Sequence, residues 1–152
     1  FGIIPNFPSR VILPRLRMLL LPEDRLLLSA NLAPNGMEPI LPQYDNDETR
    51  EWLAEFPKAH GAGKGEVKIT VETDGDLQHF AAHFHFQEPC VMEANGKHFE
   101  FCPGDSLQLF VSYRYTVESL ADTLEPYGIA IEDSFLTTNG EEGVFIAGFN
   151  KH

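Results

Sequence analysis

Three histidines lie close together in the segment LQHFAAHFHF, residues 77–86, and their spacing suits metal chemistry. Alternate side chains of a β-strand point to the same side, so His79, His83 and His85 would share one face. Three imidazoles on one face form a ligand set that transition metals accept. The same alternation also describes a half-buried strand whose phenylalanines face the core and whose histidines face water. Both interpretations stay open on the sequence alone.

The residues after these histidines resemble part of the cupin metal motif, which combines His-x-His with a glutamate and a following glycine. Glu88 and the segment PGD, residues 103–105, supply the residue types. The spacing His83-x-His85-x-x-Glu88 is shorter than in that motif, and the glycines are out of register. A cupin-like metal-binding β module using His79, His83 and His85 is therefore kept as an alternative.

Nucleophilic catalysis finds little support in the sequence. None of the serines lies in a nucleophile elbow, and neither Cys90 nor Cys102 lies in a reactive motif. A phosphate-binding glycine loop is also missing. Two cysteines define no disulfide framework, so we expect free buried thiols. We identify no catalytic residue from these patterns.

Three positions attract attention because of where they would lie. Asn6 follows the apolar run FGIIP, interpreted as a strand, and open α/β sheets bind ligands at the carboxyl ends of their strands. Tyr44 immediately precedes an acidic helix, and Ser112 shares a strand face with Phe110. Each also has an ordinary interpretation: a turn residue for Asn6, a packed aromatic for Tyr44, and strand packing for Ser112.

The charge of the chain argues against some partners. Acidic residues outnumber basic ones, 23 to 11, for a net charge of −12. Phosphate backbones repel this charge, so we expect no nucleic-acid partner. The longest apolar run, around residues 18–21, is far too short to span a bilayer, and no signal peptide is visible. We expect a cytoplasmic protein without a membrane partner, unless an upstream segment carries a signal.

The first part of the chain has the pattern of an α/β protein. Residues 9–20 carry apolar residues at helical spacing, with Ser9 as the expected N-cap. The run RLLLSANL, residues 25–32, is continuously apolar, which suits a parallel strand covered on both faces. Strand end, helix and strand form the second half of a βαβ unit. We therefore expect the chain to start inside a doubly wound α/β domain.

The middle of the chain has a different pattern. A helix is expected at residues 45–56, followed by strand-like runs between residues 67 and 115. Asn95-Gly96 between two of these runs predicts a tight hairpin. This block is predicted to form an antiparallel sheet.

The tail returns to the α/β pattern. A helix at residues 116–128, capped by Thr116 and ended by Gly128, precedes two strands. The predicted fold class is α/β with an inserted antiparallel α+β lobe. The expected bounds are residues 1–32 for the end of the core, 33–112 for the lobe and 113–152 for the return to the core.

These segments together resemble the histidine-specific S-adenosylmethionine-dependent methyltransferases, which include the ergothioneine-pathway enzyme. The resemblance is carried, in order, by FGIIPNF, LLLPEDRLLLSANLAP, ILPQYDND, FEFCPGDSLQLFVSYRYT and the terminal helix-strand-strand. It covers nearly all 152 residues but only the C-terminal part of that family's chain. It implies a Rossmann-like methyltransferase domain with a substrate lobe inserted late in the sheet.

The resemblance also assigns site residues. The family's substrate-binding asparagine and tyrosine, which hold the α-amino and carboxylate end of the amino acid, fall on Asn6 and Tyr44. The serine that helps bind the imidazole falls on Ser112. Its partner glutamate, two residues earlier, falls on Phe110, and this departure removes a polar partner of the imidazole. We therefore expect an altered pocket at the side-chain end of the substrate.

The implied function is S-adenosylmethionine-dependent N-methylation of the α-amino group of histidine, a related amino acid or another small amine. The resemblance places the cofactor loop upstream of this chain, so cofactor-binding residues stay unknown and the chain alone is expected to be inactive. A metal-binding β module and a non-catalytic acidic binding domain are the alternatives.

Overall fold

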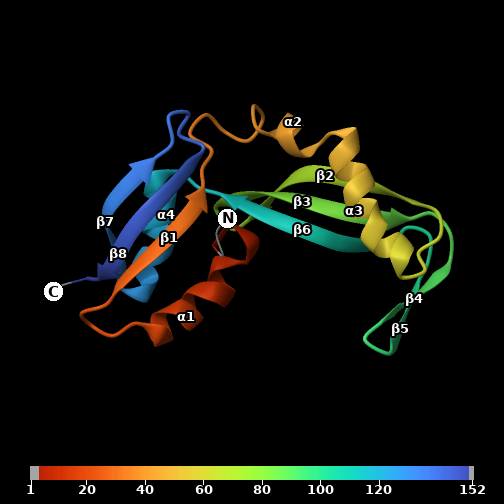
Figure 1. The fold of residues 1–152 in the computed structure, drawn as a ribbon, viewed down its shortest axis with the longest axis horizontal. Coiled ribbons are helices and arrows are strands. Elements are labelled where there is room, and N and C mark those ends of the chain that lie inside the picture. The colour runs from red at the N-terminus through yellow and green to blue at the C-terminus, as the bar shows by residue number, and fades with distance from the viewer. Residues whose placement is uncertain (1–3, 151–152) are drawn as a thin grey trace. The chain divides into compact units, whose positions relative to one another are not determined.

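The computed structural model describes residues 4–150 and shows a mixed α/β protein with antiparallel sheets (Figure 1). The chain forms two compact units. Unit 1 contains Phe1–Pro39, Thr73–His79 and Ser112–His152, and unit 2 contains Ile40–Glu72 and Phe80–Val111. The domain bounds expected from the sequence stay a prediction.

Unit 1 is built on a three-stranded sheet in the order β1 (Arg25–Asn31), β8 (Glu142–Phe149) and β7 (Ile129–Leu136). Strand β8 is antiparallel to both neighbours, with Phe145 paired to Leu28 on one side and to Ser134 on the other. Strands β1 and β7 therefore run in the same direction, although the whole of unit 2 separates them in sequence.

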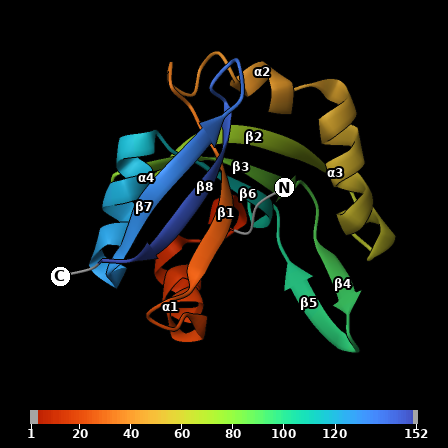
Figure 2. The same cartoon turned by 60° about the vertical axis from the view of Figure 1, so that its left-hand side comes forward.

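Two helices cover one face of this sheet, as Figure 2 shows: α1 (Ser9–Leu19) and α4 (Val117–Leu124), which continues into the 3-10 helix η2 (Glu125–Tyr127). Helix and strand residues with less than a tenth of their surface exposed form this core: Leu13, Leu28, Ala30, Leu120, Leu124, Phe145 and Ala147. The apolar residues of both helices therefore pack against the same face of the sheet.

The opposite face of the sheet carries exposed apolar side chains. Leu27 is 70% exposed, Phe135 58% and Val144 40%. The prediction that β1 is a parallel strand covered on both faces is wrong for the described residues, because its neighbour β8 is antiparallel and Leu27 is uncovered. A continuously apolar run favours burial, but it does not say which neighbouring elements cover each face.

The beginning of the described chain differs from the prediction. Residues 1–3 lie outside the described part, and Ile4–Asn6 form the 3-10 helix η1 rather than a strand. Ser9 is the first residue of α1, and Pro8 occupies the cap position without a side-chain bond. Proline fits here because the first helical amides need no partner within the helix.

The start and end of the second helix of unit 1 follow the prediction. The Thr116 hydroxyl accepts a hydrogen bond from the Ser119 amide at 3.1 Å, and the Ser119 hydroxyl accepts one from the Thr116 amide at 2.8 Å. These reciprocal bonds satisfy two amides at the helix start. Gly128 ends η2 with φ of +69°, a conformation that glycine adopts without strain. Within residues 4–150, no helix combines the length and apolar character needed to cross a bilayer.

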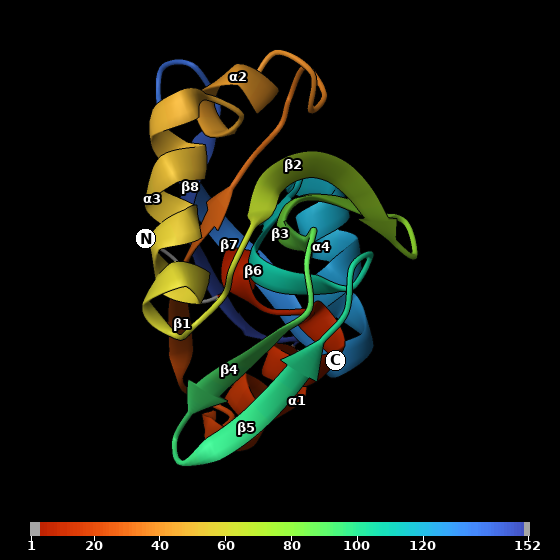
Figure 3. The same cartoon turned by 90° about the vertical axis from the view of Figure 1, so that its right-hand side faces the viewer.

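Unit 2 contains most of a second sheet, in the order β2 (Gly65–Asp74), β3 (Leu77–Phe86) and β6 (Ser106–Arg114). Figure 3 also shows its helices α2 (Leu41–Tyr44) and α3 (Asp47–Ala59) and the hairpin β4 (Cys90–Ala94) and β5 (Lys97–Phe101). The core of the unit consists of Leu53, Val67, Ile69, Ala82, Phe84, Phe86 and Met92. The chain passes between the two units within β2, β3 and β6.

The β4–β5 turn confirms the hairpin prediction. Asn95 and Gly96 adopt φ values of +53° and +70°, as a tight two-residue hairpin turn requires. Cys90 and Cys102 are free thiols, as predicted. The expectation that both are buried is wrong, because Cys90 is half-buried and Cys102 is exposed.

We expect the substitution Gly65→Ala to destabilise the protein. A methyl group on Gly65 would lie 2.3 Å from the Phe84 ring and 2.7 Å from the His85 carbonyl oxygen. Relieving this overlap requires a shift of buried groups, which costs about 1–3 kcal/mol. Chemical denaturation measures the loss against Thr70→Ala, an exposed position on the same strand. Equal stability of both variants would contradict the packing described for Gly65.

Candidate functional site

Tyr44 and Phe110, two of the predicted site residues, lie together in unit 2. The Tyr44 ring stacks on Phe80 at 4.6 Å between centroids and on Phe110 at 5.8 Å, with interplanar angles of 25° and 19°. Phe80 is fully buried, whereas Tyr44 and Phe110 are half-buried. The arrangement presents apolar ring surface where the methyltransferase resemblance expects an imidazole-binding carboxylate.

The backbone around Tyr44 is held by the junction between α2 and α3. Asn46 caps α3 by accepting a hydrogen bond from the Thr49 amide at 2.9 Å, and its side-chain amide donates to the Gln43 carbonyl at 3.1 Å. Arg50 forms ion pairs with Asp45 and with Asp47. Tyr44 is the last residue of α2, and these bonds fix the adjoining start of α3. The backbone at Tyr44 is therefore held in place from both helices.

Ser112, the third predicted residue, lies in unit 1 near the carboxyl end of β1. The side-chain amide of Asn31 donates to the Ser112 hydroxyl at 3.4 Å, and Ser112 is 4% exposed. Asn31 was missed in the sequence analysis. Its signal was available, because a polar residue that ends a continuously apolar strand lies where α/β sheets place ligand-binding groups.

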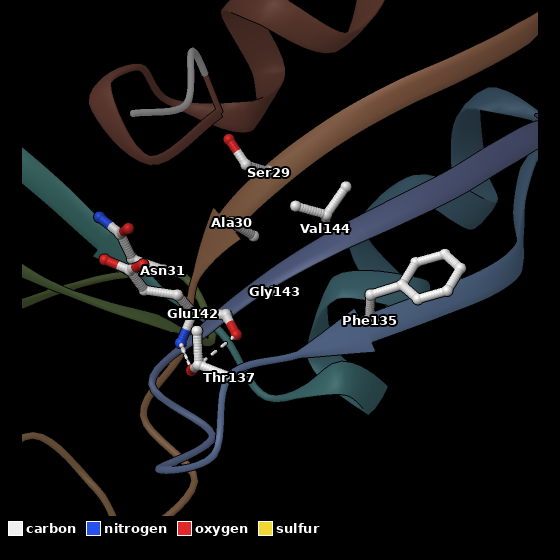
Figure 4. Close-up of a pocket in the computed structure, with 8 residues that line it drawn as sticks. All are labelled: Ser29, Ala30, Asn31, Phe135, Thr137, Glu142, Gly143 and Val144. Atoms are coloured by element: carbon white, nitrogen blue, oxygen red, sulfur yellow. Dashed lines mark hydrogen bonds between the residues drawn. The ribbon is translucent and has the colours of Figure 1, made fainter.

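A shallow pocket of about 230 Å³ opens beside this strand end (Figure 4). The residues around it are Ser29, Ala30, Asn31, Phe135, Thr137, Glu142, Gly143 and Val144. One side is closed by the Thr137 hydroxyl, which donates to the Glu142 carbonyl at 3.1 Å and accepts from the Glu142 amide at 3.2 Å. The pocket combines amide, hydroxyl and carboxylate groups with an apolar floor, which suits a small polar ligand.

Arg114, the last residue of β6, bonds the backbone beside this strand end. Its buried guanidinium donates to the Leu32 carbonyl at 3.1 Å and to the Glu141 carbonyl at 3.4 Å. The Tyr115 amide donates to the Asn31 carbonyl at 3.1 Å, and Leu32 pairs with Tyr115 as a parallel bridge. The end of β6 is thereby joined to the carboxyl end of β1.

Asn6, the fourth predicted residue, is exposed at the end of η1 in unit 1. Asn6 and Ser112 thus belong to unit 1, and Tyr44 and Phe110 to unit 2. Among these four residues, the structure shows Tyr44 stacked on Phe110. A single substrate site formed by all four residues stays a prediction.

The histidine pattern is divided between two environments. His79 is buried in unit 1 and packs against Tyr113 at 4.7 Å between ring centroids, so the expectation that it faces water is wrong. In unit 2 the rings of His83 and His85 meet edge to face at 6.3 Å, and His83 Nδ1 lies 3.4 Å from Glu72. Within residues 4–150, no three His, Cys, Asp or Glu side chains form a group that could hold a metal ion.

A charged cluster in unit 1 surrounds Asp74. The Tyr113 hydroxyl donates to the Asp74 carboxylate at 2.8 Å, and Arg10 forms an ion pair with the same carboxylate. The Arg10 and Tyr113 hydrogen bonds hold the pKa of Asp74 below its ordinary value. Burial, followed by the bond to Asp74, raises the pKa of Tyr113 to about 12. Tyr113 therefore acts as a hydrogen-bond donor at neutral pH.

No protein-family model matches the sequence, and no curated protein matches it. Among solved structures, the chain is similar to the CcbJ methyltransferase from Streptomyces caelestis, with 13% sequence identity and a TM-score of 0.38. The match covers 91% of this chain and 51% of that protein, so the chain spans about half the length of this structural neighbour.

The Asp74 cluster predicts a pH dependence of stability. A carboxyl whose pKa is lower in the folded than in the unfolded state stabilises the fold above its unfolded pKa. This contribution is lost as the pH falls through the folded pKa, so wild-type stability should decline between about pH 5 and pH 2. We expect Asp74→Asn to reduce the slope of this decline in denaturation curves. An unaltered slope in Asp74→Asn would refute the assigned cause.

Proposed function

We propose that this chain is the C-terminal part of an S-adenosylmethionine-dependent N-methyltransferase that acts on the amino group of histidine, a related amino acid or another small amine. The observation that carries the proposal is the arrangement of unit 1. Strands β1 and β7 run in the same direction, each follows a helix, and unit 2 is inserted between them.

This arrangement supports an α/β methyltransferase core for two reasons. Helix-then-strand units whose strands are parallel are the repeating element of doubly wound sheets. The antiparallel strand β8 lies between β1 and β7, and mixed sheets that contain an antiparallel strand are common among doubly wound folds. The chain order also agrees with the resemblance, which implies a substrate lobe inserted late in a Rossmann-like sheet.

The proposed roles are those that the resemblance assigns to the predicted residues, taken unit by unit. In unit 1, Asn6 would hold the amino or carboxylate end of the acceptor and Ser112 would bond a polar atom of its side chain. In unit 2, the Tyr44 hydroxyl is the group proposed for the amino or carboxylate end. An ammonium has no lone pair, so the acceptor must lose a proton before it attacks a methyl group. Orientation of the neutral amine is the main contribution that such residues make.

S-adenosylmethionine would supply a methyl group activated by its sulfonium charge. The connection between η1 and α1 does not fit a loop for this cofactor, because it runs through Phe7 and Pro8 without a glycine. We assign no residue of this chain to the cofactor. The proposal for this chain therefore concerns the acceptor.

The aromatic group in unit 2 supports an acceptor other than histidine. Tyr44, Phe80 and Phe110 present ring faces, and no carboxylate takes the place of Phe110 in that stack. A buried imidazole nitrogen left without a hydrogen-bond partner costs about 1–3 kcal/mol. An amino acid with an apolar or aromatic side chain avoids this cost.

Titration calorimetry with free amino acids and their decarboxylated amines tests this proposal. We expect phenylalanine or leucine to bind more tightly than histidine, and Tyr44→Ala to weaken binding about tenfold through loss of its hydroxyl group and of ring contact. Lys97→Ala, on the β4–β5 hairpin, serves as the control and should bind like the wild type. Tightest binding of histidine would refute the role of Phe110, and absence of binding for every amine would refute the acceptor site.

The substitution Phe110→Glu should restore an imidazole partner. We expect it to improve histidine binding relative to phenylalanine by about ten- to a hundredfold, since pairing a buried polar group recovers its desolvation cost. Phe110→Leu, which keeps the site apolar, should retain the wild-type preference. The same calorimetric panel measures both ratios, and an unchanged ratio in Phe110→Glu counts against Phe110 as a specificity residue.

A further inference from the structure

Helix α1 of unit 1 carries an exposed apolar stripe on the side away from its buried residue Leu13. Val11, Arg15, Met18 and Leu19 are spaced so that they share one helix face. Met18 is 84% exposed, Leu19 77% and Val11 40%. Contiguous exposed apolar side chains of this size mark interaction surfaces. We call these four residues the α1 stripe.

The region around the α1 stripe is basic in an otherwise acidic chain, and Arg15 is the one charged member of the stripe itself. Arginines at positions 10, 15, 17 and 25 lie in or near α1, against a net charge of −12 for the whole protein. Arg10 pairs with Asp74, Arg25 pairs with Glu132, and the Arg17 guanidinium lies 4.0 Å above the Phe149 ring. In the described part of the chain, no carboxylate forms an ion pair with Arg15. Arg15 is thus the charge that the α1 stripe presents to a partner.

Helix α3 of unit 2 carries the complementary pattern. Carboxylates and aromatic rings interleave on its exposed face, which comprises Glu48, Glu51, Trp52, Glu55 and Phe56. Trp52 is 73% exposed and Phe56 52% exposed, whereas Leu53 on the opposite side is buried. We call these five residues the α3 stripe. Glu55 forms an exposed ion pair with Lys58 at 3.5 Å, and Glu48 and Glu51 leave the stripe with a net negative charge, opposite in sign to that of Arg15.

A groove runs beside the α3 stripe. It has a volume of about 620 Å³ and is lined by Trp52, Leu53, Glu55, Phe56, Leu107, Gln108 and Leu109. Apolar side chains from α3 and β6 form most of its walls, and Glu55 is its charged member. Grooves of this kind receive one face of an amphipathic helix through residues spaced three, four and seven apart.

We propose that the α1 stripe of one copy binds the groove and α3 stripe of a second copy. Met18 and Leu19 enter the apolar groove, and Arg15 faces the carboxylates of the α3 stripe. A second copy is favoured over other partners because it satisfies both surfaces at once. An anionic lipid surface would match the basic α1 stripe but would repel the acidic α3 stripe.

Sedimentation velocity over a concentration series tests the proposal on the 152-residue chain. We expect reversible, concentration-dependent association of the wild type. Met18→Asp and Trp52→Ala should each weaken it about tenfold or more, since buried anchor residues dominate such interfaces. Both positions are exposed, so circular dichroism should show an unchanged fold. A wild type that stays monomeric at every concentration would overturn the proposal.

A charge exchange identifies the contact itself. Arg15→Glu and Glu55→Arg should each weaken association, and the double variant should recover most of it because the pair is restored with reversed signs. Lys97→Glu on the β4–β5 hairpin makes the same change in net charge as Arg15→Glu and should have no comparable effect. Failure of the double variant to recover, or equal weakening by Lys97→Glu, overturns the contact.

Vesicles containing phosphatidylserine test lipid as the alternative partner. If the wild-type chain stays monomeric but binds these vesicles, and Arg15→Glu abolishes that binding, the α1 stripe is a lipid-binding surface and the proposal is overturned.

Discussion

Pairing of strand β8 with both β1 and β7 is the constraint on which unit 1 depends. The backbone of β8 must satisfy two neighbours, and its register sets which residues enter the core, because a shift of one residue exchanges the two faces. Phe145 and Ala147 on its inner face are fully buried. On the other face, Gly148 leaves room for the ion pair between Arg25 and Glu132, since a side chain at this position would approach both within 3.2 Å.

The segments of unit 1 that lead into and out of the inserted unit pair with each other at this sheet. The chain leaves the sheet after β1 and returns at the end of β6, where the buried Arg114 guanidinium donates to the Leu32 carbonyl after β1 and to the Glu141 carbonyl before β8. The two ends of the insertion therefore meet at the carboxyl end of β1, beside Asn31 and Ser112. Polar groups at that end of an α/β sheet are placed where ligands bind. In unit 2, the aromatic group of Tyr44, Phe80 and Phe110 gives separate support to the acceptor proposal.

Local chemistry in the sequence predicted most elements, because their signals act over a few residues. Asn95-Gly96 specified a hairpin, and Thr116 specified a helix start. The environment of β1 was predicted wrongly, since an apolar run does not identify the strand that pairs with it. The bond between Asn31 and Ser112 joins residues 81 positions apart and the Arg10–Asp74 pair joins residues 64 apart. Such contacts depend on the register of whole strands and leave no local pattern.

Detection of methyl transfer is the decisive experiment for the proposed N-methyltransferase activity. The protein, expressed from the complete reading frame that encodes this chain, would be incubated with S-adenosylmethionine carrying a deuterated methyl group and with free amino acids and amines. Mass spectrometry then identifies any acceptor that gains the labelled methyl group. We expect a labelled N-methyl product, formed more readily from an amino acid with an apolar or aromatic side chain than from histidine. Absence of a labelled product from every amine would contradict the methyltransferase assignment.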